Sequence, residues 1–471
     1  MTESLDAIVV GAGSAGLAAV REIGKRTERF LLVNDGPYGT TCARVGCMPS
    51  KVLIEAANAF HKRVVFDEMG IRGAAGLSAD LPAVLARVRA LRDDFVAGTL
   101  KLTDRLGERS IAGRARLLAP DRIEVAGREY RARSIVLATG SSPVVPKPWR
   151  ELGDRILTTD TLFEQQSLPP RIAVVGLGAI GVEIAQALSR LGIQVSAFDA
   201  ADRLAGLSDP EVEEALREAL GREFPVRTGV AVELAAAGDG VEVRAGDARI
   251  VVDKVLAAVG RRPNLGGLGL EALGVKLDDR GMPPVDPGTM RIGDLPVFLA
   301  GDANGDRALL HEAADEGHIA GLNAVSPEPL CFERRTPMGV VFCDPNLATV
   351  GARFDQLDEA SAIVGEADFR RQSRARMTGR DRGIARVYAD RASGRLLGAA
   401  MCVPGGEHMA HLLALAVGQG LTVADMLRMP VYHPVLEEGL RGAFRALAKQ
   451  LPDGGVSDLS ACGGFQAEAL D

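Results

Sequence analysis

Two cysteines in the segment TTCARVGCMPSK, Cys42 and Cys47, stand five residues apart and indicate sulfur chemistry. A disulfide needs its Cα atoms within about 7 Å, whereas a regular helix rises ~7.5 Å over five residues. The two thiols can therefore be bridged only across a turn or a distorted helical start, which Gly46 permits. We expect a bridge held in such a geometry to be easily reduced, as catalytic disulfides are.

Two other interpretations of this cysteine pair stay open, namely two free buried thiols and a zinc site. The zinc site is the weaker one because no second Cys or His pair has ligand spacing, so no metal is predicted. Three further cysteines are expected to pack in the interior: Cys331, Cys343 and Cys402. Six cysteines in all are too few for a secreted disulfide scaffold, so a reducing cytoplasm is the expected location.

One glycine-rich motif occurs twice, each time between a β-branched run and an Ala- and Leu-rich helix. The glycines of the two G-x-G-x-x-G copies are Gly11, Gly13, Gly16, Gly176, Gly178 and Gly181. From the first glycine to the end of the next strand is 23 residues in both copies, which reach Asn34 and Asp199. One copy alone would be weak, but two copies with matched spacing are a strong dinucleotide signature.

These glycines let the backbone approach a pyrophosphate, and the helix that follows supplies N–H groups and the positive end of its dipole. The alternative is a glycine-tolerant turn that binds nothing. With two copies present we expect two dinucleotides, a flavin and a nicotinamide, because hydride transfer needs a donor and an acceptor. The predicted fold class is therefore α/β, with two Rossmann-like dinucleotide-binding domains.

Segments outside the motifs indicate how the chain is divided. Residues 134–143 and 294–306 read as buried strands that end at a turn, and both resemble pieces that close around a flavin. Because 294–325 follows the second motif, the first domain is expected to be discontinuous, with the second inserted into it. From about residue 330 onward, antiparallel strands followed by helices indicate an α+β domain.

Length and charge narrow the class of protein. The 471 residues suggest about three domains. With 55 basic and 62 acidic residues the formal net charge is −7, which argues against a nucleic-acid or anionic-membrane partner. No apolar run reaches the 18 or so residues of a membrane span, and the N-terminus lacks the pattern of a signal or transit peptide.

The segment GTTCARVGCMPSK resembles the redox-disulfide segment of the class I pyridine nucleotide–disulfide oxidoreductases. From Ile8 to about Leu447 the chain is similar to the dihydrolipoamide dehydrogenases of that class, and P-S-K after the second cysteine is of their type. The resemblance implies a discontinuous FAD domain (1–149 and 269–329), an inserted NAD domain (150–268), a C-terminal dimerisation domain (330–452) and a loose tail (453–471).

The resemblance also implies roles for single residues. Cys42 would exchange disulfides with the substrate, and Cys47 would face the flavin. Lys51 and Glu183 would form an ion pair near the isoalloxazine, with an ordinary surface charge as the alternative for each, and Asp302 would hold the ribityl side of FAD. The other residues expected to contact FAD are the first three motif glycines, Ser14, Asn34, Asp35, Thr41, Ala115, Thr139, Gly140 and Leu310. Those expected to contact NAD are the later three motif glycines, Ile180, Glu183, Asp199, Val230 and Gly260. Gly260 lies within the segment 258–264, which resembles a nicotinamide-site lining.

The segment YHPVLEEGL places His433 and Glu438 in the positions of the family's His–Glu dyad, where the His–Pro bond is usually cis. A free thiol with a pKa near 8.5 is only about a few per cent ionised at neutral pH, so sulfur exchange needs a base. A histidine held by a carboxylate suits that proton transfer. In the family this histidine comes from the second subunit, which implies a catalytic homodimer. Without the resemblance, His433 would be an ordinary loop histidine.

The reaction implied by the resemblance is the FAD-dependent oxidation of dihydrolipoamide with reduction of NAD, the lipoyl carrier being a separate chain. NAD is preferred to NADP because Asp199 ends the strand at which an acid binds the ribose 2′-OH, and no basic residue follows until Arg203. One alternative is an NAD(P)H-dependent reductase of another disulfide or of a metal ion, similar to mercuric reductase. Another is a non-catalytic flavoprotein that senses redox state.

Some positions depart from the family pattern or have no role in it. Asn34 stands where a Glu usually binds the FAD ribose, and Ala43-Arg44 replaces Leu-Asn between the cysteines. We hypothesise that Arg44 stabilises a thiolate or attracts an acidic substrate. Cys462 has no second cysteine beside it. Residues 370–386 contain seven Arg and one Asp, which indicates either a solvated face or a docking surface for an acidic carrier protein.

Overall fold

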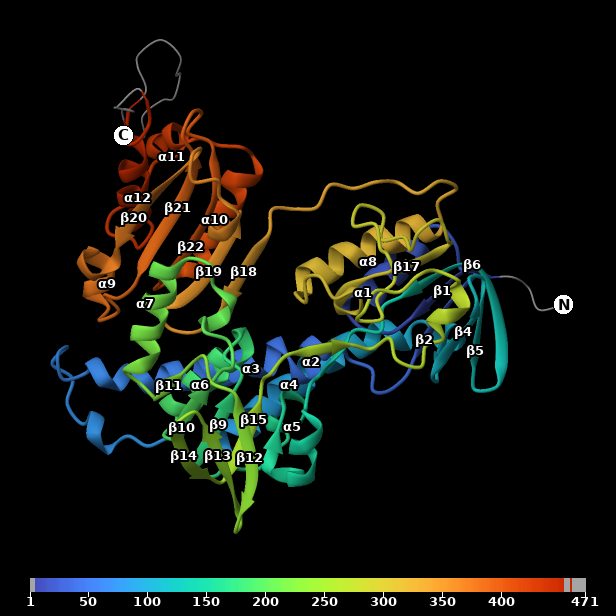
Figure 1. The fold of residues 1–471 in the computed structure, drawn as a ribbon, viewed down its shortest axis with the longest axis horizontal. Helices are drawn as coiled ribbons and strands as arrows, with labels where there is room; N and C mark the ends of the chain where they lie inside the picture. Colours follow the sequence, from blue (N-terminus) through green and yellow to red (C-terminus); the bar gives the residue numbers. More distant parts are fainter. Residues whose placement is uncertain (1–4, 453–457, 460–471) are drawn as a thin grey trace. The chain divides into compact units, whose positions relative to one another are not determined.

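The computed structural model describes residues 5–452 and 458–459 and divides the chain into two compact units (Figure 1). The first unit comprises the residues up to 55 together with 80–168 and 259–334. The second comprises 56–79, 169–258 and the residues from 335 onward. Each unit therefore contains one of the two glycine motifs.

The first glycine motif connects β1 (Leu5–Val10), α1 (Ser14–Gly24) and β2 (Phe30–Asn34). β1 lies between β2 and β6 (Arg128–Leu137) and runs parallel to both. The paired segments are runs of Val, Ile and Leu with buried side chains, which is typical of parallel strands covered on both faces.

The sheet of the first unit has the strand order β3-β2-β1-β6-β5-β4, and β17 also pairs with β6. The additional strands are β3 (Ser110–Ala112), β4 (Ala115–Ala119), β5 (Arg122–Val125) and β17 (Val297–Leu299). β17 follows the second glycine motif in the chain, yet it runs parallel to β6 in the sheet of the first. A segment from beyond the second motif thus completes this sheet.

Helix α8 (Leu310–Ala324) packs closely against α1, because glycines face alanines at the contact (Figure 1). A Cβ atom at Gly317 would lie 2.1 Å from the carbonyl oxygen of Ala15, and one at Gly321 would lie 2.6 Å from the Cα of Ala19. The loop before α8 is thereby held beside the first helix of the motif. The other elements that begin in this unit are α2 (Thr41–Val45), α3 (Cys47–His61), α4 (Leu81–Asp104), β7 (Ser141–Pro143), β8 (Ile156–Leu157), α5 (Thr159–Leu162) and β16 (Arg261–Pro263).

The second glycine motif repeats the arrangement of the first. It connects β9 (Arg171–Val175), α6 (Ala179–Arg190) and β10 (Gln194–Phe198), and β9 lies between β10 and β15 (Lys254–Ala257), parallel to both. The remaining elements of this part are α7 (Pro210–Gly221), β11 (Val226–Arg227) and an antiparallel sheet of β12 (Val232–Ala237), β13 (Gly240–Ala245) and β14 (Ala248–Val252).

The C-terminal part of the second unit is an antiparallel sheet with the order β18-β19-β22-β21-β20. Its strands are β18 (Met338–Val341), β19 (Asn346–Gly351), β20 (Ala362–Asp368), β21 (Ile384–Asp390) and β22 (Leu396–Val403). α10 (Gly406–Gly418) packs on β19 and β22, and α12 (Glu438–Ala448) packs on β20 and β21. Two shorter helices are α9 (Ser373–Met377) and α11 (Val423–Arg428). The predicted fold class is confirmed.

The longest helix of the described residues, α4, buries the side chains of Leu85 and Val88. Within residues 5–452 and 458–459, no helix is both long enough and apolar enough to span a lipid bilayer.

Candidate active site and cofactor sites

The two cysteines flank a break between two helices. Thr40 caps α2 through its side-chain oxygen, which accepts a hydrogen bond from the backbone N–H of Ala43 at 3.2 Å. α2 ends at Val45, Gly46 has φ −118° and ψ −118°, and α3 begins at Cys47. A Cβ atom at Gly46 would lie 3.1 Å from the carbonyl oxygen of Thr41, so a glycine avoids a tight contact at the break. The pair therefore spans a distorted helical junction rather than a regular helix.

No disulfide joins the two cysteines in this structure, and Cys42 is partly buried whereas Cys47 is exposed. The hydrogen bond with Cys47, and after it burial, raises the pKa of the Cys42 thiol. Two adjacent thiols that share a proton titrate as a pair, so the loss of the second proton is the harder step. The arrangement can take up and release two electrons as a dithiol and a disulfide, and the exposure of Cys47 excludes the alternative of two buried thiols.

The first turn of α3 continues from Cys47 into a short polar chain. The hydroxyl of Ser50 donates to the carbonyl oxygen of Cys47 at 3.1 Å, and the ammonium of Lys51 donates to the Ser50 hydroxyl at 3.4 Å. Lys51 is therefore attached to the backbone of the cysteine segment rather than extended into solvent.

The first glycine loop has the shape of a pyrophosphate cradle. Gly11 adopts φ +109°, and a Cβ atom there would lie 2.2 Å from the carbonyl oxygen of Ala138. A Cβ atom at Gly16 would lie 1.8 Å from the carbonyl oxygen of Gly11, whereas at Gly13 it would meet nothing within 4 Å. Gly13 is thus the open position, directly before the first N–H groups of α1.

Asn34 and Asp199 hold their glycine loops in the same way. The side-chain oxygen of Asn34 accepts a hydrogen bond from the backbone N–H of Ala12 at 2.9 Å, and Asp199 accepts one from the backbone N–H of Leu177. In both copies the donor is the residue after the first motif glycine. The amide of Asn34 therefore replaces a carboxylate in this contact, while Asp35 is exposed.

The second glycine loop repeats the steric pattern of the first. A Cβ atom at Gly181 would lie 1.8 Å from the carbonyl oxygen of Gly176, whose φ is +93°, and a Cβ atom at Gly178 would meet nothing within 4 Å. Asp199 also accepts a hydrogen bond from the backbone N–H of Ala201 at 2.8 Å. Its carboxylate is thus fixed at the carboxyl end of β10, where an acid can reach a ribose hydroxyl.

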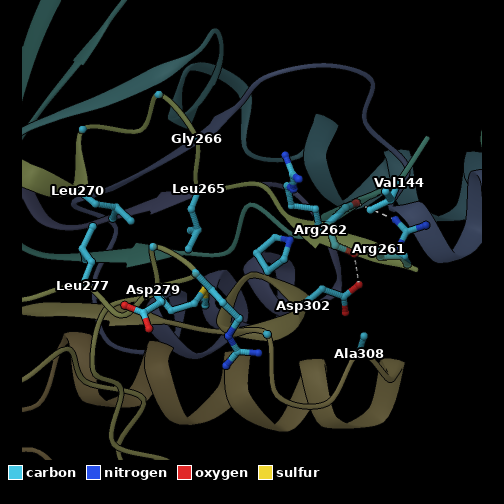
Figure 2. Close-up of a pocket in the computed structure, with 18 of the residues that line it drawn as sticks. Val144, Arg261, Arg262, Leu265, Gly266, Leu270, Leu277, Asp279, Asp302 and Ala308 are labelled. Carbon is cyan, nitrogen blue, oxygen red and sulfur yellow. Dashed lines mark hydrogen bonds between the residues drawn. The ribbon is translucent and has the colours of Figure 1, made fainter. Parts of the chain in front are cut away.

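Asp302 lies at the end of a three-member chain of polar groups. The guanidinium of Arg261 donates to the hydroxyl of Ser141 at 2.8 Å, and that hydroxyl donates to the carboxylate of Asp302 at 2.6 Å. Figure 2 shows Arg261 and Asp302 on the wall of a pocket of about 850 Å³ in the first unit. Its apolar lining includes Leu265, Leu270, Leu277 and Met282.

The loop that carries Asp302 is anchored by a buried acid. Glu316 of α8 accepts hydrogen bonds from the backbone N–H of Gly301 and the amide of Asn304, each at 2.7 Å, and pairs with Arg334 at 2.9 Å. Burial raises the pKa of Glu316 although all three partners oppose that shift.

Within the described residues, the hydroxyl of Thr139 is a buried polar atom with no hydrogen-bond partner.

These features fit a bound FAD. The open Gly13, the N–H groups of α1, the unpartnered Thr139 hydroxyl and the positioned Asp302 carboxylate all lie in the first unit, and each offers a polar contact of the kind a dinucleotide uses. No group of three or more His, Cys, Asp or Glu side chains in the described residues has the arrangement of a metal site.

The other predicted cofactor contacts occupy the ends of elements. Ser14, Thr41, Ala115 and Leu310 are the first residues of α1, α2, β4 and α8, respectively. Gly140 and Gly260 have positive φ, at +67° and +110°. Ile180 is partly exposed in the first turn of α6, and Val230 donates its backbone N–H to the carbonyl oxygen of Asp199 at 3.0 Å. From the segment 258–264, β16 pairs with β7, and the backbone N–H of Asn264 bonds the carbonyl oxygen of Gly140.

Glu183 is buried and accepts a hydrogen bond from the backbone N–H of Phe342 at 2.9 Å, so it is not a surface charge. Its ion pair with Lys51 stays a prediction, because the two residues belong to different units. Cys343 and Cys402 are buried as expected, whereas the prediction that Cys331 packs in the interior is wrong, since it is exposed. Cys462 lies outside the described residues.

The His–Glu dyad is formed within the second unit. Nδ1 of His433 lies 2.9 Å from Oε1 of Glu438, and Oε2 of Glu438 accepts a hydrogen bond from the backbone N–H of Val435 at 3.1 Å. The bond between His433 and Pro434 is cis. The hydrogen bond with His433, followed by that with Val435, lowers the pKa of Glu438. An ionised Glu438 requires the proton on Nδ1, which leaves Nε2 of His433 as the free acceptor.

Several residues of these sites gave no signal in the sequence. Ser141 and Arg261 position Asp302, Glu316 anchors its loop, and Gln372 contacts the dyad segment. Each acts through a partner more than ten positions away in the chain, which no local pattern reveals. Glu316 had one usable sign, since Glu312 and Glu316 stand four positions apart on the apolar face of an Ala- and Gly-rich helix.

Comparison with known proteins places this geometry in a family. Residues 5–317 match the family described as pyridine nucleotide-disulphide oxidoreductase, and residues 338–444 match its dimerisation domain. The chain belongs to the pyridine nucleotide-disulphide oxidoreductase family. The resemblance identified from the cysteine segment and the two glycine motifs is thereby confirmed.

Individual relatives extend over the whole length of the chain. A dihydrolipoyl dehydrogenase of Thermus scotoductus is 34% identical over 464 residues, which are 95% of this chain and 98% of that protein. A mercuric reductase of Bacillus cereus is 29% identical and aligns with 98% of this chain and 73% of its own length. The copper(II) complex of the HOCl-induced flavoprotein disulfide reductase RclA from Escherichia coli shares the fold, with a TM-score of 0.83 at 22% identity, covering 94% of this chain and 99% of that one.

The family determines the general chemistry of this chain. It is an enzyme, a flavin disulfide oxidoreductase of the dihydrolipoyl dehydrogenase type, and it uses FAD and NAD(H). The match to the dimerisation domain supports a homodimer.

Proposed function

We propose that this enzyme oxidises the dihydrolipoyl group of a carrier protein on a separate chain and reduces NAD. The observation that carries the proposal is the combination of a Cys42/Cys47 pair with the His433–Glu438 dyad in one chain. A thiol substrate needs a base to lose its proton and a disulfide to receive its electrons, and these two groups supply both.

In the proposed reaction, Nε2 of His433 accepts the proton of one substrate thiol, and Glu438 stabilises the resulting imidazolium. The substrate thiolate attacks Cys42, the bond between Cys42 and Cys47 breaks, and Cys47 leaves as a thiolate. The second substrate thiol then attacks the first substrate sulfur, and its proton passes to Cys42, which leaves as a thiol. The carrier has lost two electrons and two protons, and the cysteine pair holds the electrons. A bound FAD would supply the two-electron chemistry that connects the cysteine pair to NAD.

The two parts of this reaction are assigned to different subunits of the homodimer. One subunit supplies His433 with Glu438, and the other supplies Cys42 with Cys47. We assign Gly13, the start of α1, Thr139 and Asp302 to the binding of FAD. We assign Gly178, the start of α6 and Asp199 to the binding of NAD. The role of Arg44 in stabilising a thiolate or attracting an acidic substrate stays a prediction, as does the cytoplasmic location.

A second candidate is the reduction of another disulfide or of a metal ion by NAD(P)H. The observation behind this candidate is the similarity to a mercuric reductase over nearly the whole chain. The same cysteine pair would then give electrons to the substrate instead of taking them from it.

Turnover by the purified holoenzyme separates the two candidates. We expect NAD reduction with dihydrolipoamide, much slower reduction of NADP, and little NADH oxidation with glutathione disulfide or Hg(II). Rapid NADH oxidation with either acceptor and none of the dihydrolipoamide activity would contradict the proposal and support the second candidate. Asp199→Ala should raise the KM for NADH markedly, and an unchanged KM would refute its assignment to the ribose.

A further inference from the structure

Helix α9 and the turn before it carry three arginines that are exposed and make no ion pair in the described part of the chain. These residues, Arg371, Arg374 and Arg376, are called the arginine patch. Met377, 58% exposed, lies beside them. In a chain of net charge −7, three unpaired guanidinium groups on one five-residue helix and its preceding turn form a local excess of positive charge.

Three other arginines of the segment 370–386 form ion pairs with acidic residues of the same unit. Arg370 pairs with Asp368 at 2.9 Å, and Arg380 pairs with Asp344 at 2.7 Å. Arg386 pairs at 2.5 Å with Asp209, which is fully buried. Ion pairs therefore account for these three, whereas no ion pair in the described part of the unit accounts for the arginine patch.

The arginine patch is joined to the His–Glu dyad by hydrogen bonds through a buried glutamine. The side-chain oxygen of Gln372 caps α9 by accepting from the backbone N–H of Ala375 at 2.7 Å. Its side-chain nitrogen donates to the carbonyl oxygen of Val435 at 2.6 Å. The N–H of Val435 in turn donates to Glu438, which holds His433. Four consecutive hydrogen bonds thus connect the helix of the patch to the imidazole.

Packing reinforces this connection. Phe369, which is buried, lies so close to the start of α12 that a Cβ atom at Gly439 would be 2.4 Å from its ring. The residue before Gly439 is Glu438 of the dyad. The arginine patch and the dyad are therefore fixed to the same rigid corner of the second unit, and a partner bound at one has a defined position at the other.

We propose that the arginine patch is the docking surface for an acidic protein domain that carries the dithiol substrate to His433. The proposal rests on the proposed function, and names the class of its partner. A free dihydrolipoamide molecule is neutral and gains nothing from three guanidinium groups, whereas an acidic domain is steered toward them and held in register with the imidazole. Nucleic acid is the less suitable partner, because tight binding uses about 6–10 phosphate contacts, and the patch offers three arginines in an acidic chain.

The test compares two triple variants of the holoenzyme with the same change in charge. The patch variant is R371E/R374E/R376E. The matched control is R87E/R105E/R133E, three exposed arginines of the first unit that also make no recorded ion pair. Both are assayed with a purified lipoyl domain of net negative charge and with free dihydrolipoamide, at low and at high salt. If the charge reversal prevents folding, R371Q/R374Q/R376Q removes the charge more gently.

We expect the patch variant to lose about tenfold or more in kcat/KM with the acidic lipoyl domain at low salt, because electrostatic steering is worth that much. Its kcat/KM with free dihydrolipoamide and both activities of the control variant should stay within about twofold of wild type. High salt should lower the carrier activity of wild type toward that of the patch variant, since screening removes the same attraction.

Three results would overturn the proposal. The first is an equal loss of carrier activity in the two triple variants. The second is a wild-type activity with the lipoyl domain that is no more salt-sensitive than its activity with free dihydrolipoamide. The third is tighter binding of a DNA duplex or of anionic vesicles than of the lipoyl domain at the patch. In all three cases the proposed function stands if wild type still oxidises free dihydrolipoamide. A wild type without that activity refutes the proposed function itself, and the docking proposal with it.

Discussion

At the residue scale, His433 and Glu438 are exposed to different degrees but are bound to each other, with side-chain exposures of 72% and 29%. The carboxylate holds Nδ1 and a backbone N–H, so it fixes the orientation of the ring as well as its proton. A second His–Glu contact in the same unit joins His408 to Glu407 at 3.3 Å, and among the described residues no backbone N–H anchors the Glu407 carboxylate. The two pairs share their chemistry and differ in the role we assign to them.

We predict that His433→Gln lowers kcat for dihydrolipoamide by about 10²–10⁴-fold, the usual contribution of a general acid–base. Steady-state turnover measures this loss, and thermal unfolding of the variant checks that the fold persists. His408→Gln is the matched control and should retain wild-type turnover. Equal kinetics for wild type and His433→Gln would exclude the histidine from proton transfer.

The raised pKa of the Cys42 thiol leads to a pH prediction. Its largest cause is the hydrogen bond with Cys47, so Cys47→Ala should lower the pKa of Cys42. A lower thiol pKa means more thiolate at neutral pH, and alkylation of Cys42 by iodoacetamide should then accelerate at pH 7–8, by about tenfold for each unit of decrease. Peptide mass spectrometry across pH follows the reaction, with Cys331→Ala as control. A rate profile unchanged by Cys47→Ala would show that the two thiols do not interact.

At the element scale, the glycine motifs were predictable because their constraint is local. Gly11 and Gly176 need positive φ, and Gly16 and Gly181 sit against a carbonyl oxygen, so only glycine suits these positions. The helices that follow and the parallel strands around them were predictable from periodicity. The polar contacts that position Asp302 were not, because they join β7, β16 and α8 across long stretches of chain.

Two glycines of the second motif should respond differently to alanine. A Cβ atom at Gly181 would overlap the carbonyl oxygen of Gly176 at 1.8 Å, so Gly181→Ala should destabilise the protein by about 1–3 kcal/mol or more. A Cβ atom at Gly178 meets nothing within 4 Å, so Gly178→Ala should fold normally and instead raise the KM for NADH. Thermal unfolding and NADH kinetics on both variants provide the comparison. Equal destabilisation by the two changes, with unaltered KM values, would contradict the assignment of Gly178 to the pyrophosphate.

The contacts of the segment that carries His433 and Glu438 were only partly predictable from the sequence. The motif H-P-x-L-x-E predicted that His433 and Glu438 belong together, and their contact is present in the structure. The link to α9 through Gln372 was not predictable, because Gln372 and Val435 are 63 positions apart. A run of arginines in the sequence could not show which of them are paired with acids and which are left exposed.

At the scale of the whole molecule, a buried charge network joins distant segments of the second unit. Arg190 of α6 pairs with Glu223 at 2.7 Å and with Asp344 at 3.2 Å, and it donates to the side chain of Asn58 on α3 at 2.6 Å. Burial alone would raise the pKa of Asp344, but Arg380 and Arg190 outweigh it and lower that pKa. The network connects the part that holds the second glycine motif to the part that holds the dyad.

We predict that Arg190→Leu destabilises the protein by about 3–5 kcal/mol, because it removes the ion-pair partner of the half-buried Glu223 and leaves Asp344 with Arg380 alone. Arg222→Leu, which removes an exposed pair with Glu218, should cost about 0.5 kcal/mol or less. A carboxyl with a lowered folded pKa stabilises the fold above its unfolded pKa of about 3.9 and loses that contribution as pH falls. The gap between wild type and Arg190→Leu in thermal unfolding should therefore shrink below about pH 4. A gap that widens in acid would contradict the assigned charges.

Electron transfer in this enzyme is proposed to pass through a reversible bond between Cys42 and Cys47. Quantification of the thiols of the oxidised holoenzyme, before and after anaerobic addition of NADH, tests it most directly. We predict that Cys42 and Cys47 resist alkylation before reduction and that both become labelled after it, while labelling of Cys331 is unchanged. Two cysteines that are equally reactive before and after NADH would show that no such bond exists and would contradict the account.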